Sequence, residues 1–445
     1  MERRTLRPLA RTLTDFALFV NGAADFTSVV ASKRLVRFHD GRKVRRSIHE
    51  KVSSLCIMED FMSTSGFQLT NPQTFATLTD HERNALSGRF NLADGHARYS
   101  ISQNYSALLE KLPPLLTRSY EQDEAEYDFG KAFFGLGGQT LPDHERTLYC
   151  PSASISIELA ANYLRMKHLS VSLIEPIFDN LADCIRRHDV PLQPLKEEFL
   201  YENDTSNWHK AIDTDAIFLV LPNNPTGYLL SPAFFSQIID FCVKEDKLLL
   251  LDFSFRFFIP ELQVWDQYKV LEQSGVRYIA FEDTGKTWPT FEIKVSPLVA
   301  DKQTFTALQR IYLDIFICHS PLALTLVGEF VKTSQQEGPL KSFQSIITKN
   351  RTLLRTTLAN TPLKPLSSSI ASVEWVYIED TINDIELVKI LHEYGIYILT
   401  GKQFFWSQKQ SSSKFVRIAL MRDTDLFAQG MRVLQNNLAA IFKNA

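Results

Sequence analysis

The stretch KLLLLDFSF (247–255) is a short apolar run that ends on an aspartate, Asp252, and continues into aromatic residues. Three similar apolar runs lie in the same part of the chain, namely LSVSLIEP (169–176), DAIFLVLP (215–222) and VRYIAFED (276–283). Amphipathic helix patterns separate the runs, an alternation that is typical of parallel strands joined by crossover helices. The region from about 145 to 300 therefore predicts an α/β fold with a central, mainly parallel sheet sandwiched by helices.

One of the intervening helices shows clear end signals. In SPAFFSQIIDFCVKEDK (231–247), Ser231 suits the N-cap and Pro232 the first helical position. Phe234, Phe235, Ile238, Ile239 and Cys242 recur on one helical face. This spacing indicates packing against the sheet rather than chemistry.

Beyond residue 300 the pattern changes. Three helices are predicted near 302–317, 321–336 and 340–360, separated by Ser-Pro and Glu-Gly-Pro breaks. The tail then contains, in order, SVEWVYI (372–378), a helix near 382–394 closed by Gly395, IYILTG (396–401), KFVRIALM (414–421) and a helix near 424–442. We interpret this tail as a smaller C-terminal α/β domain.

The length supports more than one domain. With 445 residues and 44% hydrophobic content, the chain can bury a large core and is too long for one ordinary compact domain. We expect an N-terminal arm over 1–88 that packs on the small domain or the pocket, a large domain over 89–320 and a small domain over 321–445.

Overall charge offers no argument for a polyanionic partner. The 48 basic and 51 acidic residues give a net charge of −3, so neither nucleic acid nor membrane binding is indicated. A basic stretch at 32–51 is interrupted by apolar residues, and we interpret it as a solvated surface rather than a phosphate or nucleic-acid patch. A small, neutral or anionic substrate is the better expectation.

The cysteines indicate a reducing compartment. They are odd in number, scattered and without metal-ligand spacing: Cys56, Cys150, Cys184, Cys242 and Cys318. We therefore expect free thiols and no metal. The Arg-rich N-terminus has an apolar run, FALFV, that is too short for a signal peptide, so a cytoplasmic protein is favoured over one with a transit peptide.

Three polar residues follow the predicted strands closely. Asp252 ends its apolar run, Lys286 follows YIAF by a few residues, and Asn224 lies in LPNNPTG (221–227). The carboxyl ends of strands in open α/β sheets are where ligands bind. Each residue is common in such a place, and Asn224 alone is explained equally well as a turn residue.

Taken together, these segments resemble the class I/II aminotransferases, which are fold-type I enzymes dependent on pyridoxal 5′-phosphate (PLP). The family motifs are NPTG, an aspartate two to three residues before an aromatic, a lysine motif SxSKxxxxxGxR and a late arginine inside a strand. They are matched in order by LPNNPTG, LLLLDFSF (248–255), FEDTGKTWPTFEIK (281–294) and FVRIAL (415–420). The resemblance covers roughly residues 90–440.

The resemblance implies a role for each matched residue. Lys286 would form the internal aldimine, Asp252 would pair with the pyridine nitrogen, and Asn224 would hydrogen-bond the 3-oxygen. Arg417 would hold the substrate α-carboxylate, for which its planar fork is suited. Further implied contacts are Phe178 stacked on the ring, Ser152, Ala153 and Ser154 around the phosphate at a helix N-terminus, and Gly95 of NLADGHA (91–97) in the substrate pocket.

Three positions depart from the family pattern. Phe255 replaces a tyrosine and so lacks a hydroxyl donor to the 3-oxygen, which should raise the pKa of the imine. Lys294 replaces the phosphate-binding arginine and keeps the charge without the fork. Asp283 replaces a serine, and its charge would repel the phosphate unless it turns away or pairs with Lys294.

The function that the resemblance implies is transamination between an α-amino acid and a 2-oxo acid, in a homodimer. Phe255, Asp283 and Lys294 keep open a PLP-dependent lyase, cyclase or oxidase acting on a modified amino acid. A non-catalytic protein on the same fold is the third hypothesis, and the presence of Lys286, Asp252 and Arg417 together argues against it. Gly-Lys-Thr at 285–287 ends like a nucleotide-binding loop, but Ala280 stands where that motif needs glycine.

Overall fold

A computed structural model describes residues 77–101, 105–117, 121–260, 263–290, 292–366, 370–407 and 413–443. Most of the expected N-terminal arm, including the basic stretch at 32–51 and Cys56, lies outside these residues. The described part begins with helix α3 (Leu78–Ala85).

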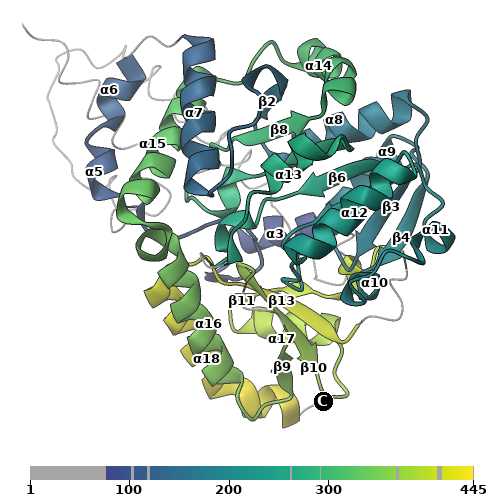
Figure 1. The fold of residues 1–445 in the computed structure, drawn as a ribbon. Coiled ribbons are helices and arrows are strands. Elements are labelled where there is room, and N and C mark those ends of the chain that lie inside the picture. The colour runs from purple at the N-terminus through teal and green to yellow at the C-terminus, as the bar shows by residue number, and fades with distance from the viewer. Residues whose placement is uncertain are drawn as a thin grey trace, which may run out of the picture. The chain divides into compact units, whose positions relative to one another are not determined.

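A seven-stranded mixed sheet forms the centre of the larger part of the fold (Figure 1). Its strands are β2 (Thr147–Cys150), β3 (Val171–Glu175), β4 (Leu192–Lys196), β5 (Ala216–Val220), β6 (Leu248–Asp252), β7 (Arg277–Phe281) and β8 (Ser296–Ala300). Their order is β2-β8-β7-β6-β5-β3-β4, and β8 runs antiparallel to β7 and β2 while the other neighbours are parallel. The predicted mainly parallel sheet is confirmed.

Helices flank this sheet. They are α7 (Gln122–Leu136), α8 (Ala153–Met166), α9 (Asp179–Arg187), α10 (Glu198–Tyr201), α11 (Trp208–Ala211), α12 (Pro232–Lys244), α13 (Gln267–Ser274), α14 (Lys302–Ile315) and α15 (Pro321–Glu337). Helix α12 contacts β6 and packs with α13, whereas α8 contacts β2, β7 and β8 and packs with α9 and α14. Strands β5 and β6 are buried along their whole length, which explains their continuous apolar runs.

A second, four-stranded antiparallel sheet is built from later residues. It comprises β9 (Leu363–Pro365), β10 (Val373–Ile378), β12 (Leu399–Thr400) and β13 (Phe415–Ala419), in the order β12-β13-β10-β9. Helices α16 (Ser345–Leu358), α17 (Asp384–Glu393) and α18 (Thr424–Lys443) accompany it. The expected smaller C-terminal α/β part is therefore present, with its helices and sheet in the lower half of Figure 1.

Local sequence explains several element ends. The Ser231 hydroxyl accepts from the Phe234 N–H at 3.2 Å, with Pro232 in the first helical position, as predicted for α12. Gly395 follows α17 with φ of 72°, a left-handed conformation that glycine adopts without strain. The remaining α-helices of the described chain are both short, namely α5 (Ser106–Leu109) and α6 (Leu112–Thr117).

Two predicted elements are divided in the structure. The helix expected over 340–360 begins as a π-helical turn, η6 (Leu340–Gln344), before α16 continues it. The expected strand 396–401 is split, because β11 (Ile396–Tyr397) pairs in parallel with β1 (Phe90–Asn91) while β12 pairs with β13. The partner β1 comes from a distant segment, so local alternation of residues could not reveal the split.

Among the described residues, the structure has no helix that combines the length and apolarity needed to cross a membrane.

Candidate active site

One cavity of about 180 Å³ lies at the carboxyl ends of β5, β6 and β7. All but one of the site residues predicted from the sequence line it: Ser152, Ala153, Ser154, Phe178, Asn224, Asp252, Phe255, Asp283, Lys286, Lys294 and Arg417. Gly95 is the exception, but it lies beside the cavity, since a Cβ there would stand 3.5 Å from the Arg417 guanidinium. A larger open hollow of about 1270 Å³ near the start of β7 contains none of the predicted residues.

Asp252 is the last residue of β6 and is 7% exposed. Its Oδ1 accepts the Ser254 N–H at 2.8 Å, which orients the carboxylate at the strand end. Burial raises the pKa of Asp252 to about 6, while hydrogen bonding from Ser254 and the charge of Lys286 limit the rise. The group can therefore be ionised at neutral pH and would be stabilised further by a cation placed against it.

Lys286 closes a short 3-10 turn, η5 (Thr284–Lys286), after β7. Asp283 caps this turn, because its Oδ1 accepts the Gly285 N–H at 2.8 Å. Its Oδ2 accepts the Ala153 N–H at 3.2 Å, so the carboxylate lies at the N-terminus of α8. Burial opposes its ionisation, but the charges of Lys286, Lys294 and His96 lower the pKa of Asp283.

Asp283 thus turns toward the backbone of α8, and the described contacts include no direct ion pair with Lys294. Lys294 pairs instead with Glu292, at 3.1 Å, and its side chain runs along Gly285. Although burial disfavours its charge, Asp283 and Glu292 raise the pKa of Lys294, so the ammonium stays charged. A cation is therefore available near the α8 N-terminus, as the phosphate assignment requires.

Helix α8 begins where the sequence predicted a phosphate site. Ser152 is its N-cap, with a hydroxyl that accepts the Ile155 N–H at 3.4 Å. The Ser154 hydroxyl accepts from Asn180 at 3.2 Å. Of the three residues expected to bind the phosphate, Ala153 already donates its backbone N–H to Asp283. A phosphate bound here would therefore contact Ser152 and Ser154 and be stabilised by the helix dipole.

Arg417 lies on β13 and is only 1% exposed. Its guanidinium donates to Glu82 Oε1 at 2.9 Å and to Asn224 Oδ1 at 3.3 Å, and it lies 5.5 Å from the ring centres of Phe178 and Phe404. The buried Nε has no hydrogen-bond partner among the described atoms. The arginine is thus held in place in the cavity wall, with its charge paired to Glu82.

Glu82, on α3, was not identified from the sequence. Its Oε1 accepts both from Arg417 and from the Gly95 N–H, at 2.9 and 3.0 Å, and the residue lines the cavity. Its local sequence, TDHERNA, is that of an ordinary surface helix. A separation of 335 residues from Arg417 removes any local signal of the pairing.

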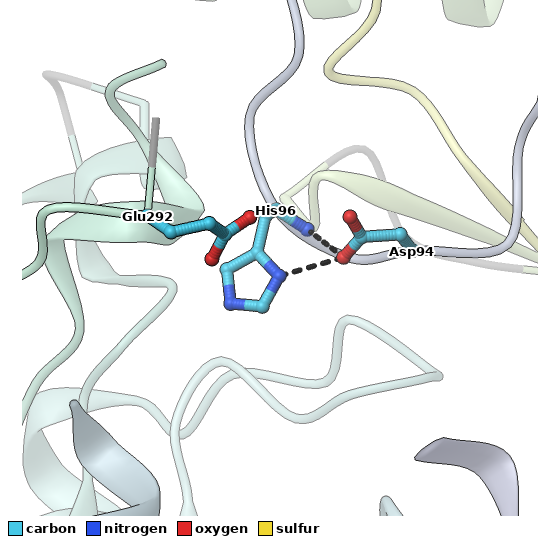
Figure 2. Close-up of side chains that lie close together, drawn as sticks. All are labelled: Asp94, His96 and Glu292. Carbon is cyan, nitrogen blue, oxygen red and sulfur yellow. Dashed lines mark hydrogen bonds and ion pairs between the residues drawn. The ribbon is translucent and has the colours of Figure 1, made fainter. Parts of the chain in front are cut away.

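His96 is the second residue that sequence reasoning missed, although the quoted segment NLADGHA contains it. Figure 2 shows its ring between Asp94 and Glu292, with Nδ1 at 2.6 Å from Asp94 Oδ1. Its Nε2 lies 3.5 Å from Lys286 Nζ and 3.1 Å from Lys294 Nζ. The imidazole therefore contacts the lysine predicted to carry the chemistry.

Asp94, His96 and Glu292 lie close enough to resemble a metal-ligand group (Figure 2). However, Arg98 pairs with both carboxylates, and Lys294 also pairs with Glu292. Burial opposes the ionisation of Asp94, yet His96, Arg422 and Arg98 hold its pKa far below the usual range. These cations already neutralise the acids and would repel a metal ion, so the cluster is better described as a support for His96.

The side chains fit the predicted cofactor. PLP presents a pyridine nitrogen, an aldehyde, a 3-oxygen and a phosphate. A buried carboxylate, an amine, an amide and a helix N-terminus with a lysine line the same cavity, in Asp252, Lys286, Asn224 and the α8 start with Lys294. The raised pKa of Asp252 also indicates a carboxylate that lacks a nearby cation sufficient to offset its burial.

Comparison with known proteins agrees with this fit. The family described as aminotransferase class I and II matches residues 118–428. Among solved structures, MppP soaked with the product 2-ketoarginine is 32% identical, covering 78% of this chain and 98% of that chain with a TM-score of 0.73.

Two more distant structures share the fold. An archaeal alanine:glyoxylate aminotransferase is 15% identical, with 82% of this chain and 96% of that chain covered and a TM-score of 0.67. YbdL from Escherichia coli, for which a methionine aminotransferase function is described, is 14% identical, with 81% and 96% covered and a TM-score of 0.65.

Proposed function

The chain belongs to the class I and II aminotransferase family, whose cofactor is pyridoxal 5′-phosphate, and we propose that it transfers the amino group of an α-amino acid to a 2-oxo acid. The observation that carries the proposal is the convergence of Lys286, Asp252 and Arg417 on one cavity. A lysine, a ring-nitrogen partner and a carboxylate clamp are together what the reaction needs.

Bound PLP would supply the electron sink for the pair left when the Cα proton departs. Lys286 Nζ would remove that proton from Cα and hold it for later return. The Asp252 carboxylate would hold the proton on the ring nitrogen, and Asn224 would orient the 3-oxygen. Lys294 and the α8 N-terminus would hold the phosphate.

Arg417 would bind the α-carboxylate of the substrate. Its guanidinium is paired with Glu82 in this structure, so the substrate carboxylate must take the place of that carboxylate. Gly95 leaves the required space, because a side chain there would meet the guanidinium at 3.5 Å. Glu82 would then lose its cation while still in the cavity wall.

A substrate with a cationic side chain would give Glu82 a new partner. MppP, the relative described with the product 2-ketoarginine, supports this choice, since that product is the 2-oxo acid of arginine. We therefore extend the proposal to arginine or a similarly cationic amino acid. One ligand would then satisfy both residues. Its α-carboxylate would replace Glu82 as the partner of Arg417, and its cationic side chain would replace Arg417 as the partner of Glu82.

The test compares L-arginine with L-citrulline, its uncharged isostere, as amino donors to a 2-oxo acid acceptor. We expect kcat/KM to favour arginine at least tenfold, and Glu82→Gln to remove that preference while leaving alanine turnover within a few-fold, because the lost contact is charge-assisted. Glu386→Gln, a helix-capping glutamate outside the cavity, serves as the matched control. Equal turnover of arginine and citrulline would refute the cationic substrate but not transamination.

A second candidate is an oxidase or lyase reaction on the same amino acid. The contact of His96 with Lys286 favours it, because a second acid–base group allows a further proton to be removed from the substrate. In the oxidase case, amino acid, oxygen and water would give the 2-oxo acid, ammonia and hydrogen peroxide. Oxygen uptake with stoichiometric ammonia, independent of a 2-oxo acid acceptor, would establish this reaction in place of transamination.

We also propose that the enzyme is a homodimer. Leu313, Ile315 and Ile317, at and beyond the end of α14, are 52%, 57% and 88% exposed, and exposed apolar side chains so close together in the chain favour burial by a second copy. Light scattering of the holoenzyme should give twice the chain mass, and Ile317→Asp should shift it toward monomer. Leu426→Asp, at a separate exposed position on α18, should not. A monomeric wild-type enzyme would exclude the dimer.

A further inference from the structure

Ser254 carries a buried hydroxyl beside Asp252. The residue is 3% exposed, lines the cavity, and follows Asp252 by two positions. Its backbone N–H donates to Asp252, and its Oγ lies close enough to that carboxylate to lower the pKa of Asp252, but the Oγ makes no hydrogen bond of normal geometry to a described atom. A buried hydroxyl without a partner destabilises a protein, so a partner that enters with the ligand is the natural explanation.

The groups around Ser254 narrow the choice of that partner. When the aldehyde carbon is joined to Lys286 and the protonated ring nitrogen is paired with Asp252, the oxygen acceptors of PLP are those of its phosphate and its 3-oxygen. The phosphate belongs at the α8 N-terminus with Lys294, which leaves the 3-oxygen and its neighbour Asn224. Phe255, also in the wall, brings no hydroxyl of its own.

We propose that the Ser254 hydroxyl donates a hydrogen bond to the 3-oxygen of bound PLP, in place of the hydroxyl that Phe255 lacks. The inference rests on the proposed function only for the placement of the cofactor, and it holds whether the enzyme transfers amino groups or oxidises its substrate. It makes Ser254 a cofactor-tuning residue, because a donor at the 3-oxygen stabilises negative charge there.

The experiment titrates the visible absorption of the holoenzyme with pH, which reports the proton on the Lys286 nitrogen when it is joined to the cofactor. A donor to the 3-oxygen favours loss of that proton, so Ser254→Ala should raise the midpoint by about one pH unit, the equivalent of one ordinary hydrogen bond. Ser254→Cys, a weak donor of similar shape, should give a smaller rise. Phe255→Tyr should lower the midpoint and reverse the rise in the double variant.

Ser372→Ala is the matched control. Its hydroxyl is likewise buried and without a described partner, but it does not line the cavity, so the midpoint should not move. An unchanged midpoint in both Ser254 variants would overturn the proposal. Failure of the wild-type protein to develop visible absorption with PLP would instead contradict the cofactor placement itself.

A final experiment distinguishes a direct hydrogen bond from Ser254 to the 3-oxygen from an indirect effect of Ser254 on Asp252. The holoenzyme is prepared with the carbocyclic PLP analogue that has CH in place of the ring nitrogen, so the Asp252 contact no longer matters. The shift caused by Ser254→Ala should persist with the analogue. Loss of the shift would show that Ser254 acts only on Asp252, and would overturn the proposal.

Discussion

The cavity has two halves that are held together in different ways. The cofactor half consists of Asn224, Asp252, Lys286 and the α8 N-terminus, placed by neighbouring parallel strands and by contacts between residues two apart, such as Asp252 with Ser254. The half proposed for the substrate consists of Glu82 and Arg417, which pair across 335 residues, and of His96, which reaches Lys286 across 190 residues. The first is set by the sheet, whereas the second consists of charge pairs that a ligand can exchange.

Removing Lys286 should have the largest effect, because it is the amine proposed to join the cofactor and to remove the Cα proton. We expect Lys286→Ala to lower kcat by roughly 10³-fold, the usual scale of a general base, while PLP still binds without a covalent bond. Steady-state kinetics and absorption spectra measure both, with Lys244→Ala, an exposed lysine, as control. Partial recovery with added methylamine would sharpen the assignment, and a variant retaining a tenth of the activity would contradict it.

Changing Arg417 tests the substrate half alone. Arg417→Lys keeps the charge but loses the two-pronged fork, and it should reduce kcat/KM by roughly 10²-fold, chiefly through KM, since hydrogen bonds to charged groups contribute about 1.5–3 kcal/mol. The absorption spectrum of the bound cofactor should stay unchanged. If the variant also failed to bind PLP, the cofactor half would depend on Arg417, and the proposed independence of the two halves would be contradicted.

Protonation of Asp252 should weaken the cofactor half at low pH. The pKa of this group in the cofactor-free protein is raised to about 6, so its carboxylate is lost as the pH falls through that value. PLP affinity should therefore drop by up to about tenfold per pH unit below 6. Because the phosphate titrates in the same range, the control is pyridoxal without phosphate, and Asp252→Asn should abolish the dependence for that ligand.

Asp94 should give the smallest effect, because we expect it to influence the reaction indirectly, through His96. Asp94→Asn removes the anion at Nδ1 and should lower kcat about tenfold or less, with a shifted acidic limb in the pH profile and little change in KM. A purely structural role would leave the pH profile in place. Loss of activity with an unshifted profile would therefore remove His96 from the proton transfers.

The difference between the halves also explains which site residues could be predicted from the sequence. Asp252, Asn224 and Lys286 each follow an apolar strand, and strand order in a parallel sheet brings such ends together, so their convergence was predictable. Glu82 and His96 follow no comparable pattern. The expectation that Asp283 turns away or pairs with Lys294 left two possibilities, and the structure shows the carboxylate bonded to the α8 backbone.

Thus the sequence alone determined the α/β fold, the main strands and helices, and the convergence of the residues proposed to bind the cofactor, because those depend on periodicity, capping and residues close to strand ends. Only the tertiary structure decided that Glu82 pairs with Arg417, that His96 contacts both Asp94 and Lys286, and that the Ser254 hydroxyl is buried in the cavity wall beside Asp252. The reason is physical. Charge pairing and burial depend on which residues are neighbours in space, and the separation of two residues along the chain does not reveal whether they are such neighbours.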